Sequence, residues 1–419
     1  MEPVRTETAP ARGARVASSW QRTLWVMCAV QCIMMMAFSS MSPFLPLYIE
    51  ELGVRDPRAI DLWSGVIASS NFLIMALVSP LWGAVGDRKG RKLMVMRTTV
   101  AISFFTFVMG LAQNVWELLG ARMLQGAFSG YSASATALVA TVVPEEKLGT
   151  ALGWMQSSAM VGSLIGPLAG GLVSDHVHSY RVVFYLTSAF AMTAFLITFF
   201  LVHEGFQKPA AAPGRKPSVL GQFRAVRELR AVQTMFLVLF LAQFSVMNVQ
   251  PVLPVYIQDL AAHSQHVATY SGLAFAMTGL AGLVAAPILG NRSDRIGYRR
   301  TLTVAMTGAA LFYIPQALAP NIWVFMLSRF GLGLFVGGIL PTANALVGRL
   351  APKDQRGQIY GFTSSATFVG SFAGPLLGGL GSAVFGIRWM LGLTAVLYFL
   401  NMLWVRWKVK DPPALEHPG

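Results

Sequence analysis

Apolar runs long enough to cross a bilayer recur along the whole chain, and few folds accommodate them. The chain is 54% hydrophobic and only 12% charged, with a mean hydropathy of +0.56. A spanning helix needs about 20 mostly apolar residues. The sequence therefore predicts an all-α membrane protein with twelve transmembrane helices, at about 24–48, 63–83, 93–112, 117–142, 150–174, 182–202, 232–256, 269–290, 301–319, 322–348, 357–380 and 388–406.

The net charge of +14 could indicate nucleic-acid binding, so the placement of the charges matters. With an even number of spans, both termini lie on one side of the membrane. That side carries 26 of the 32 Lys and Arg residues, and the opposite side carries Arg55, Arg58, Arg181 and Arg388. The positive-inside rule then places both termini in the cytoplasm. The basic residues set the topology, and we expect no nucleic-acid partner.

The two halves of the chain repeat one plan. The pattern G-x-x-x-D-R-x-G-x-[KR] starts at Gly83 and again at Gly290, and the segment PFLPLYIEEL from Pro43 matches PVLPVYIQDL from Pro251. Four such landmarks share an offset of 207 or 208 residues. Six spans in each half give both halves the same orientation, as in transporters built from parallel repeats. We expect a tail at 1–23, a six-helix bundle at 24–202, a cytoplasmic linker at 203–231, a second bundle at 232–406 and a tail at 407–419.

The repeated basic hairpin predicts a cytoplasmic latch between the halves. Its glycines, Gly83, Gly86 and Gly90, permit a tight turn, and Asp87 can bond basic neighbours or lie against a helix N-terminus. The alternative is a solvated loop whose charges only enforce orientation. Repetition of the spacing favours the latch, formed by Gly83, Asp87, Arg88, Gly90, Arg91 and Asp294.

These motifs carry a family resemblance over essentially the whole chain. GAVGDRKGRK resembles the signature loop of the major facilitator superfamily, and LLGARMLQG, with Arg122, resembles its fourth-helix motif. GSLIGPLAGG resembles the fifth-helix motif of antiporters among drug exporters, and PFLPLY resembles the first helix of twelve-helix drug–proton antiporters. The chain is thus similar to bacterial multidrug-resistance-protein-G-type exporters. The resemblance implies two pseudo-symmetric six-helix bundles in a bacterial plasma (inner) membrane.

The fifth-helix motif places small residues on one stripe. Gly162, Gly166 and Gly170 follow at four-residue intervals, and Pro167 favours a bend. Together with Gly171 they predict close helix packing, repeated in the eleventh helix and suited to a sliding interface between the bundles. Generic helix packing is the alternative. The resemblance implies that this region limits leakage and favours exchange.

Proton exchange needs a titratable group, and the sequence offers few. An arginine within a span is costly, which makes Arg122 a candidate for an aqueous cavity, with snorkelling to the surface as the alternative. The family's corresponding arginine is implicated in proton transfer. No acid lies near the centre of a predicted span, so we expect Glu50 or Asp61 to serve with Arg122 in proton coupling.

The resemblance implies a central cavity built by the first, fourth, seventh and tenth helices. Each polar or aromatic candidate could instead bond a neighbouring helix or face lipid. The expected lining consists of Gln31, Phe38, Gln125, Tyr131, Gln243, Phe244, Asn248, Gln250 and Asn344.

The function expected is export of lipophilic or amphipathic small molecules by proton antiport through alternating access. A narrow metabolite porter for a sugar, an amino acid or an organic acid is the alternative. Enzymatic motifs such as H-E-x-x-H and the P-loop are missing from the sequence, and we expect no enzymatic activity, cofactor or metal site. We expect the protein to work as a monomer within the lipid bilayer, with its substrate and protons as partners.

Overall fold

The computed structural model describes residues 12–202, 204, 230–261, 264–350 and 356–409. The first half contains α1 (Arg12–Met41), η1 (Ser42–Phe44), α2 (Leu45–Glu51), α3 (Pro57–Lys89), α4 (Arg91–Leu111), α5 (Val115–Ala127), α6 (Tyr131–Val142), η2 (Glu145–Lys147), α7 (Leu148–Val177) and α8 (Arg181–Leu201). The second half contains α10 (Arg230–Met247), α11 (Leu253–Leu260), α12 (Val267–Ile296), α13 (Tyr298–Ala317), α14 (Ile322–Leu350), α15 (Arg356–Phe385) and α16 (Ile387–Lys408). Most of the expected linker and much of both expected tails lie outside the described residues.

These helices confirm the all-α membrane fold. Within the described ranges, nine segments have the length and hydropathy of a membrane span, and α10 adds a shorter apolar helix. The first expected span is divided into α1, η1 and α2, and the fourth and seventh expected spans are each divided in two. Prolines at the starts of η1, α2 and α11 accompany two of these divisions, and Gly130, with a φ of 110°, separates α5 from α6.

The basic hairpins are shorter than the sequence suggested. Gly90 alone connects α3 to α4, and Gly297 alone connects α12 to α13, each with a φ of 96°. Such a backbone favours glycine. Gly83 and Gly86, which we expected in the turn, lie instead inside α3, because the helix continues to Lys89.

Each half has its own apolar interior. In the second half, one cluster is built around residues such as Tyr256, Phe325 and Tyr398, and separate clusters in the first half surround Met34 and Tyr48. Large apolar side chains are also exposed around the outside, including Phe104, Leu327 and Trp389. Exposed apolar surface of this extent fits a protein whose outer face contacts lipid.

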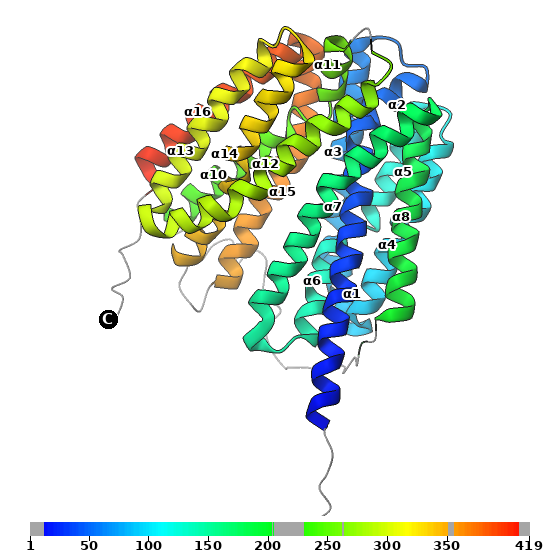
Figure 1. Ribbon diagram of the computed structural model, residues 1–419, viewed down its shortest axis with the longest axis vertical. Coiled ribbons are helices and arrows are strands. Elements are labelled where there is room, and N and C mark those ends of the chain that lie inside the picture. The colour runs from blue at the N-terminus through cyan, green and yellow to red at the C-terminus, as the bar shows by residue number, and fades with distance from the viewer. Residues whose placement is uncertain (1–11, 203, 205–229, 262–263, 351–355, 410–419) are drawn as a thin grey trace, which may run out of the picture.

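The two bundles lean together at one end and diverge at the other (Figure 1). We call the end with α2 and α11, where they meet, the closed end, and the end with the basic hairpins the hairpin end. Two helix pairs make most of the contact between the halves: α3 with α15, and α7 with α12. These two crossings determine which residues can act between the bundles.

Candidate functional site

The crossing of α3 and α15 brings glycine against glycine and buries an acid. A Cβ added to Gly65 would lie 3.0 Å from the Cα of Gly379, so only glycine allows this approach. Asp61, one turn before Gly65, is only 8% exposed. Its Oδ2 accepts a hydrogen bond of 2.6 Å from Ser382 Oγ, and its buried Oδ1 has no hydrogen-bond partner among the described residues. Asp61 is therefore a contact between the bundles rather than the solvated helix end that its sequence position suggests.

The crossing of α7 and α12 has the same construction. A Cβ on Gly171 would lie 2.6 Å from the carbonyl oxygen of Ala268, and a Cβ on Gly272 would overlap the carbonyl group of Pro167. An acid again joins the bundles, since the Asp175 carboxylate accepts hydrogen bonds from the backbone amides of Ala268 (3.2 Å) and Thr269 (2.8 Å). The two crossings thus follow the sequence repeat.

The short helices α2 and α11 add a third contact at the closed end. Gln258 Nε2 donates to Glu50 Oε2 at 3.2 Å, across the two halves. Glu51, by contrast, accepts from Tyr180 N at 2.8 Å and lies 3.7 Å from the Arg181 guanidinium, within the first half. Burial, together with the carboxylates of Asp175, Glu50 and Glu51, raises the pKa of Tyr180 to about 12. Tyr180 is therefore neutral at physiological pH.

At the hairpin end, α4 is capped by an acid that the sequence did not single out. Glu204 accepts hydrogen bonds from Arg91 N (2.8 Å) and Lys92 N (2.7 Å), at the start of α4. The Arg88 side chain is exposed and Gly90 is buried. Asp87 and Asp294 lie in the last turns of α3 and α12, and their side chains are outside the described part of the structure. Glu204 thus lies against a helix N-terminus, which is one of the two arrangements expected for Asp87.

The glycines of the fifth-helix motif face two different helices. Added Cβ atoms on Gly162, Gly166 and Gly170 would clash with α1 of the same bundle or with Phe44 just after it, whereas Gly171 and Pro167 face α12 of the other. The regular stripe therefore packs α7 within its own half. The interface between the bundles is made by Pro167 and Gly171 of the same motif.

Arg122 is half-buried and belongs to a polar group inside the first bundle. Its Nη1 donates to Gln125 Oε1 at 2.6 Å, and Gln125 Nε2 donates to Thr106 Oγ1 at 2.7 Å. The structure does not bring together the three expected coupling residues. Within the described chain, no hydrogen bond or ion pair joins Arg122 to Glu50 or Asp61, both of which bond the second bundle instead.

The residues expected to line a cavity occupy different environments. Tyr131 is 2% exposed inside an apolar cluster, and fully buried Asn248 exchanges hydrogen bonds with Thr394. Gln243 donates to Ser371 Oγ at 3.0 Å, which joins α10 to α15. The others are buried (Gln31), half-buried (Phe38, Phe244 and Gln250) or exposed (Asn344). Tyr131 and Asn248 thus pack within their own bundles. This agrees with the alternative given above, in which such residues contact a neighbouring helix.

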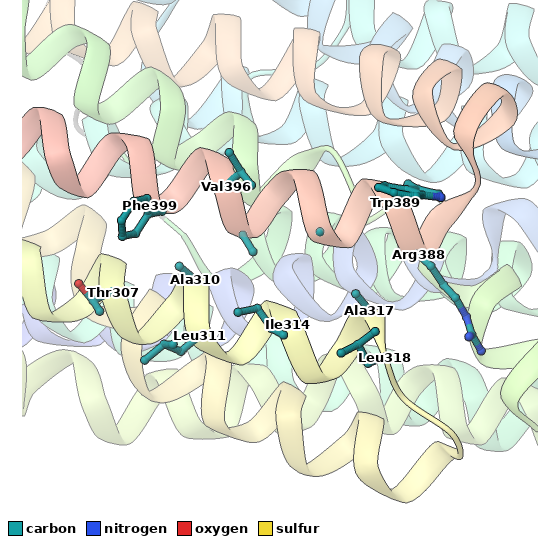
Figure 2. Close-up of a pocket in the computed structure, with 12 residues that line it drawn as sticks. Thr307, Ala310, Leu311, Ile314, Ala317, Leu318, Arg388, Trp389, Val396 and Phe399 are labelled. Carbon is teal, nitrogen blue, oxygen red and sulfur yellow. The ribbon is translucent and has the colours of Figure 1, made fainter.

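A separate groove of about 660 Å³ lies between α13 and α16 (Figure 2). Its walls are almost wholly apolar and include Leu311, Ile314, Val396 and Phe399, with Arg388 at one end. These four apolar side chains are exposed, so the groove opens on the surface of the second bundle that faces lipid. None of the expected cavity residues lines it.

Sequence reasoning missed Asp175, Ser382 and Glu204. A signal existed for the first two. Asp175 lies four residues after Gly171 and Ser382 three residues after Gly379, and the two glycines are matched positions of the repeat. No comparable signal marks Glu204, because its partner amides lie more than 110 residues earlier.

Comparison with known proteins agrees with this architecture. Residues 27–264 and 235–419 match the family model of the Major Facilitator Superfamily. The multidrug resistance protein MdtG of Salmonella arizonae is 36% identical over 395 residues, which cover 93% of this chain and 96% of that protein. MdtG of Salmonella typhimurium is equally similar, with the same coverage.

Two solved structures share the fold at low sequence identity. A bacterial homolog of the human lysosomal transporter Spinster has a TM-score of 0.74 at 14% identity, covering 95% of this chain and 97% of that one. A mutant form of the nucleoside transporter NupG has a TM-score of 0.73 at 13% identity, covering 93% of this chain and all of that one. The family model, the MdtG relatives and the duplicated crossings lead to one conclusion: this chain belongs to the Major Facilitator Superfamily.

Proposed function

We propose that this protein exports lipophilic or amphipathic small molecules by proton antiport. Its MdtG relatives are named multidrug resistance proteins and align over nearly the whole chain. The observation that carries the proposal is the contact between the bundles, which the described residues make at the closed end through two matched crossings. In a rocking transporter, such contacts close one side of the membrane while the other side is open.

The distribution of basic residues indicates which side of the membrane each end of the protein faces. Both hairpins lie at the hairpin end, and the positive-inside rule assigns that end to the cytoplasm. The closed end then faces outward, and the conformation is the one that loads substrate from inside the cell. The hairpins would meet only in the opposite state, where Asp87 and its basic neighbours form the latch.

Asp61 is our proposed proton carrier. A buried carboxylate is costly unless it is paired, and within the described chain only one of its oxygens has a hydrogen-bond partner in this state. Protonation removes the charge, and opening the α3–α15 crossing brings the group to the outer surface. Arg122 lies elsewhere in the same bundle. In this proposal it takes part in proton coupling through its hydrogen bond to Gln125, which in turn bonds Thr106. We propose that the transporter works as a monomer, because one chain supplies both bundles and both crossings between them.

Efflux from living cells tests the proposal. The protein is expressed in a bacterium that lacks its main exporters, and efflux of several unrelated dyes and drugs is followed with and without a protonophore. We expect export of several compounds, abolished by the protonophore. Good expression without export of any of them would contradict multidrug efflux, and a response to one metabolite alone would indicate a narrow porter.

A further inference from the structure

We infer that Asp175 is a gating residue of the transport cycle: its carboxylate, presented by α7, caps α12 of the opposite bundle and stabilises the state closed at that end. This inference deepens the proposed transport cycle. Asp175 does not touch substrate and acts by positioning α12. Its role follows from a hydrogen bond across the bundles, from the absence of a side-chain cap by His266, and from the sequence repeat.

The bond has the geometry of a helix cap. Ala268 and Thr269 are the second and third residues of α12, and their backbone amides donate to the two carboxylate oxygens of Asp175. The first four amides of a helix have no partner inside the helix, and a carboxylate there is favoured by hydrogen bonding and by the helix dipole. The amides at the start of α12 require such a partner in every conformation, and Asp175 supplies it in this one.

The residue that usually caps a helix does not do so here. His266, the residue before α12, makes no side-chain hydrogen bond to the helix. The cap that most helices take from their own sequence is instead supplied from another bundle. When α7 and α12 separate, these amides lose their hydrogen bonds to the carboxylate. The open state is therefore higher in free energy by the contribution of these bonds.

The repeat shows that both crossings are secured from the same half. Gly65 corresponds to Gly272 at an offset of 207, and Gly171 to Gly379 at an offset of 208. Shifting Asp175 by 208 residues gives Ala383, and shifting Asp61 by 207 gives Ala268. The second half thus has alanine where the first half has an acid. The N-terminal bundle provides the gating carboxylate at each crossing.

The distance between two spin labels at the closed end tests this role without any substrate. Labels are attached to cysteines at Arg55 and Pro320, exposed positions in the two halves, after Cys28 and Cys32 are replaced by alanine. Asp175→Ala should lower the ratio of closed to open molecules about 2- to 30-fold, the usual effect of losing a cap. Asp175→Asn keeps one acceptor oxygen and should cause a smaller shift in the same direction.

Glu117→Gln is the matched control. The Glu117 carboxylate accepts hydrogen bonds from Gln113 N and Asn114 Nδ2, all within the first bundle, and is exposed. This variant should leave the distance distribution unchanged. Distances in Asp175→Ala identical to those of the parent protein would overturn the inference, as would an equal shift in Glu117→Gln. Since the measurement needs no drug, its failure is distinguishable from a failure of the proposed efflux.

Discussion

Replacing Gly272 by alanine should force α12 away from α7 and destabilise the closed end. The added Cβ would overlap the carbonyl oxygen of Pro167 and lie 2.8 Å from its carbonyl carbon. Carbon atoms in contact are usually about 3.5–4.0 Å apart, so the helices must separate by roughly 1 Å. The obstructing atoms belong to the backbone, and no side-chain rotation can relieve the overlap.

Overpacking of this kind costs about 1–3 kcal/mol. The cost applies only where α7 and α12 touch, so the closed state alone is destabilised. The ratio of closed to open molecules should therefore fall about 5- to 150-fold. The label pair at Arg55 and Pro320 measures this ratio directly, and dye efflux measures its consequence for transport.

Gly279→Ala is the control, because Gly279 lies on the same helix, two turns further on, with nothing within 4 Å of an added Cβ. Gly65→Ala, in the matched crossing, should act in the same direction as Gly272→Ala, since its Cβ would meet Pro375 and Gly379. If Gly272→Ala gives the distances and efflux of Gly279→Ala, the glycine crossing does not control closure and our reasoning is wrong.

Three further predictions concern the polar groups. Asp61→Asn should abolish proton-driven efflux but leave flux down a substrate gradient in vesicles; intact proton-driven efflux would exclude Asp61 as the carrier. Arg122→Lys and Arg122→Ala should both lose coupling, because neither keeps the Arg122 hydrogen bond to Gln125 in its present geometry; full activity of both would remove Arg122 from the mechanism. Glu204→Ala should cost the start of α4 about 0.5–2 kcal/mol. Faster hydrogen exchange at Arg91 and Lys92 would reveal that loss, and unchanged exchange would contradict the cap.

The basic hairpins and the end of the fifth-helix motif show where sequence reasoning reaches its limit. The pattern around Gly90 correctly indicated a turn, because a positive φ is a local demand that glycine meets. The stripe of Gly162, Gly166 and Gly170 correctly indicated close packing. It did not show that Gly170 packs within its own half while its neighbour Gly171 faces α12. Adjacent residues on a helix point in different directions, and only the neighbouring helices decide what each one meets.

The sequence by itself determined the membrane fold and its duplication. In a bilayer each spanning segment must satisfy its own backbone hydrogen bonds, so span length and hydropathy are local properties that can be read segment by segment. The offset of 207 or 208 residues then relates the halves without any knowledge of their packing.

Only the tertiary structure decided which polar groups meet. Asp61 bonds Ser382, 321 residues away, and Asp175 bonds amides more than 90 residues away. Tyr131 and Asn248 have the sequence appearance of cavity residues but pack inside their own bundles. The physical reason is that a side chain's partner depends on how two helices cross, and a crossing is set by many weak contacts along both helices together.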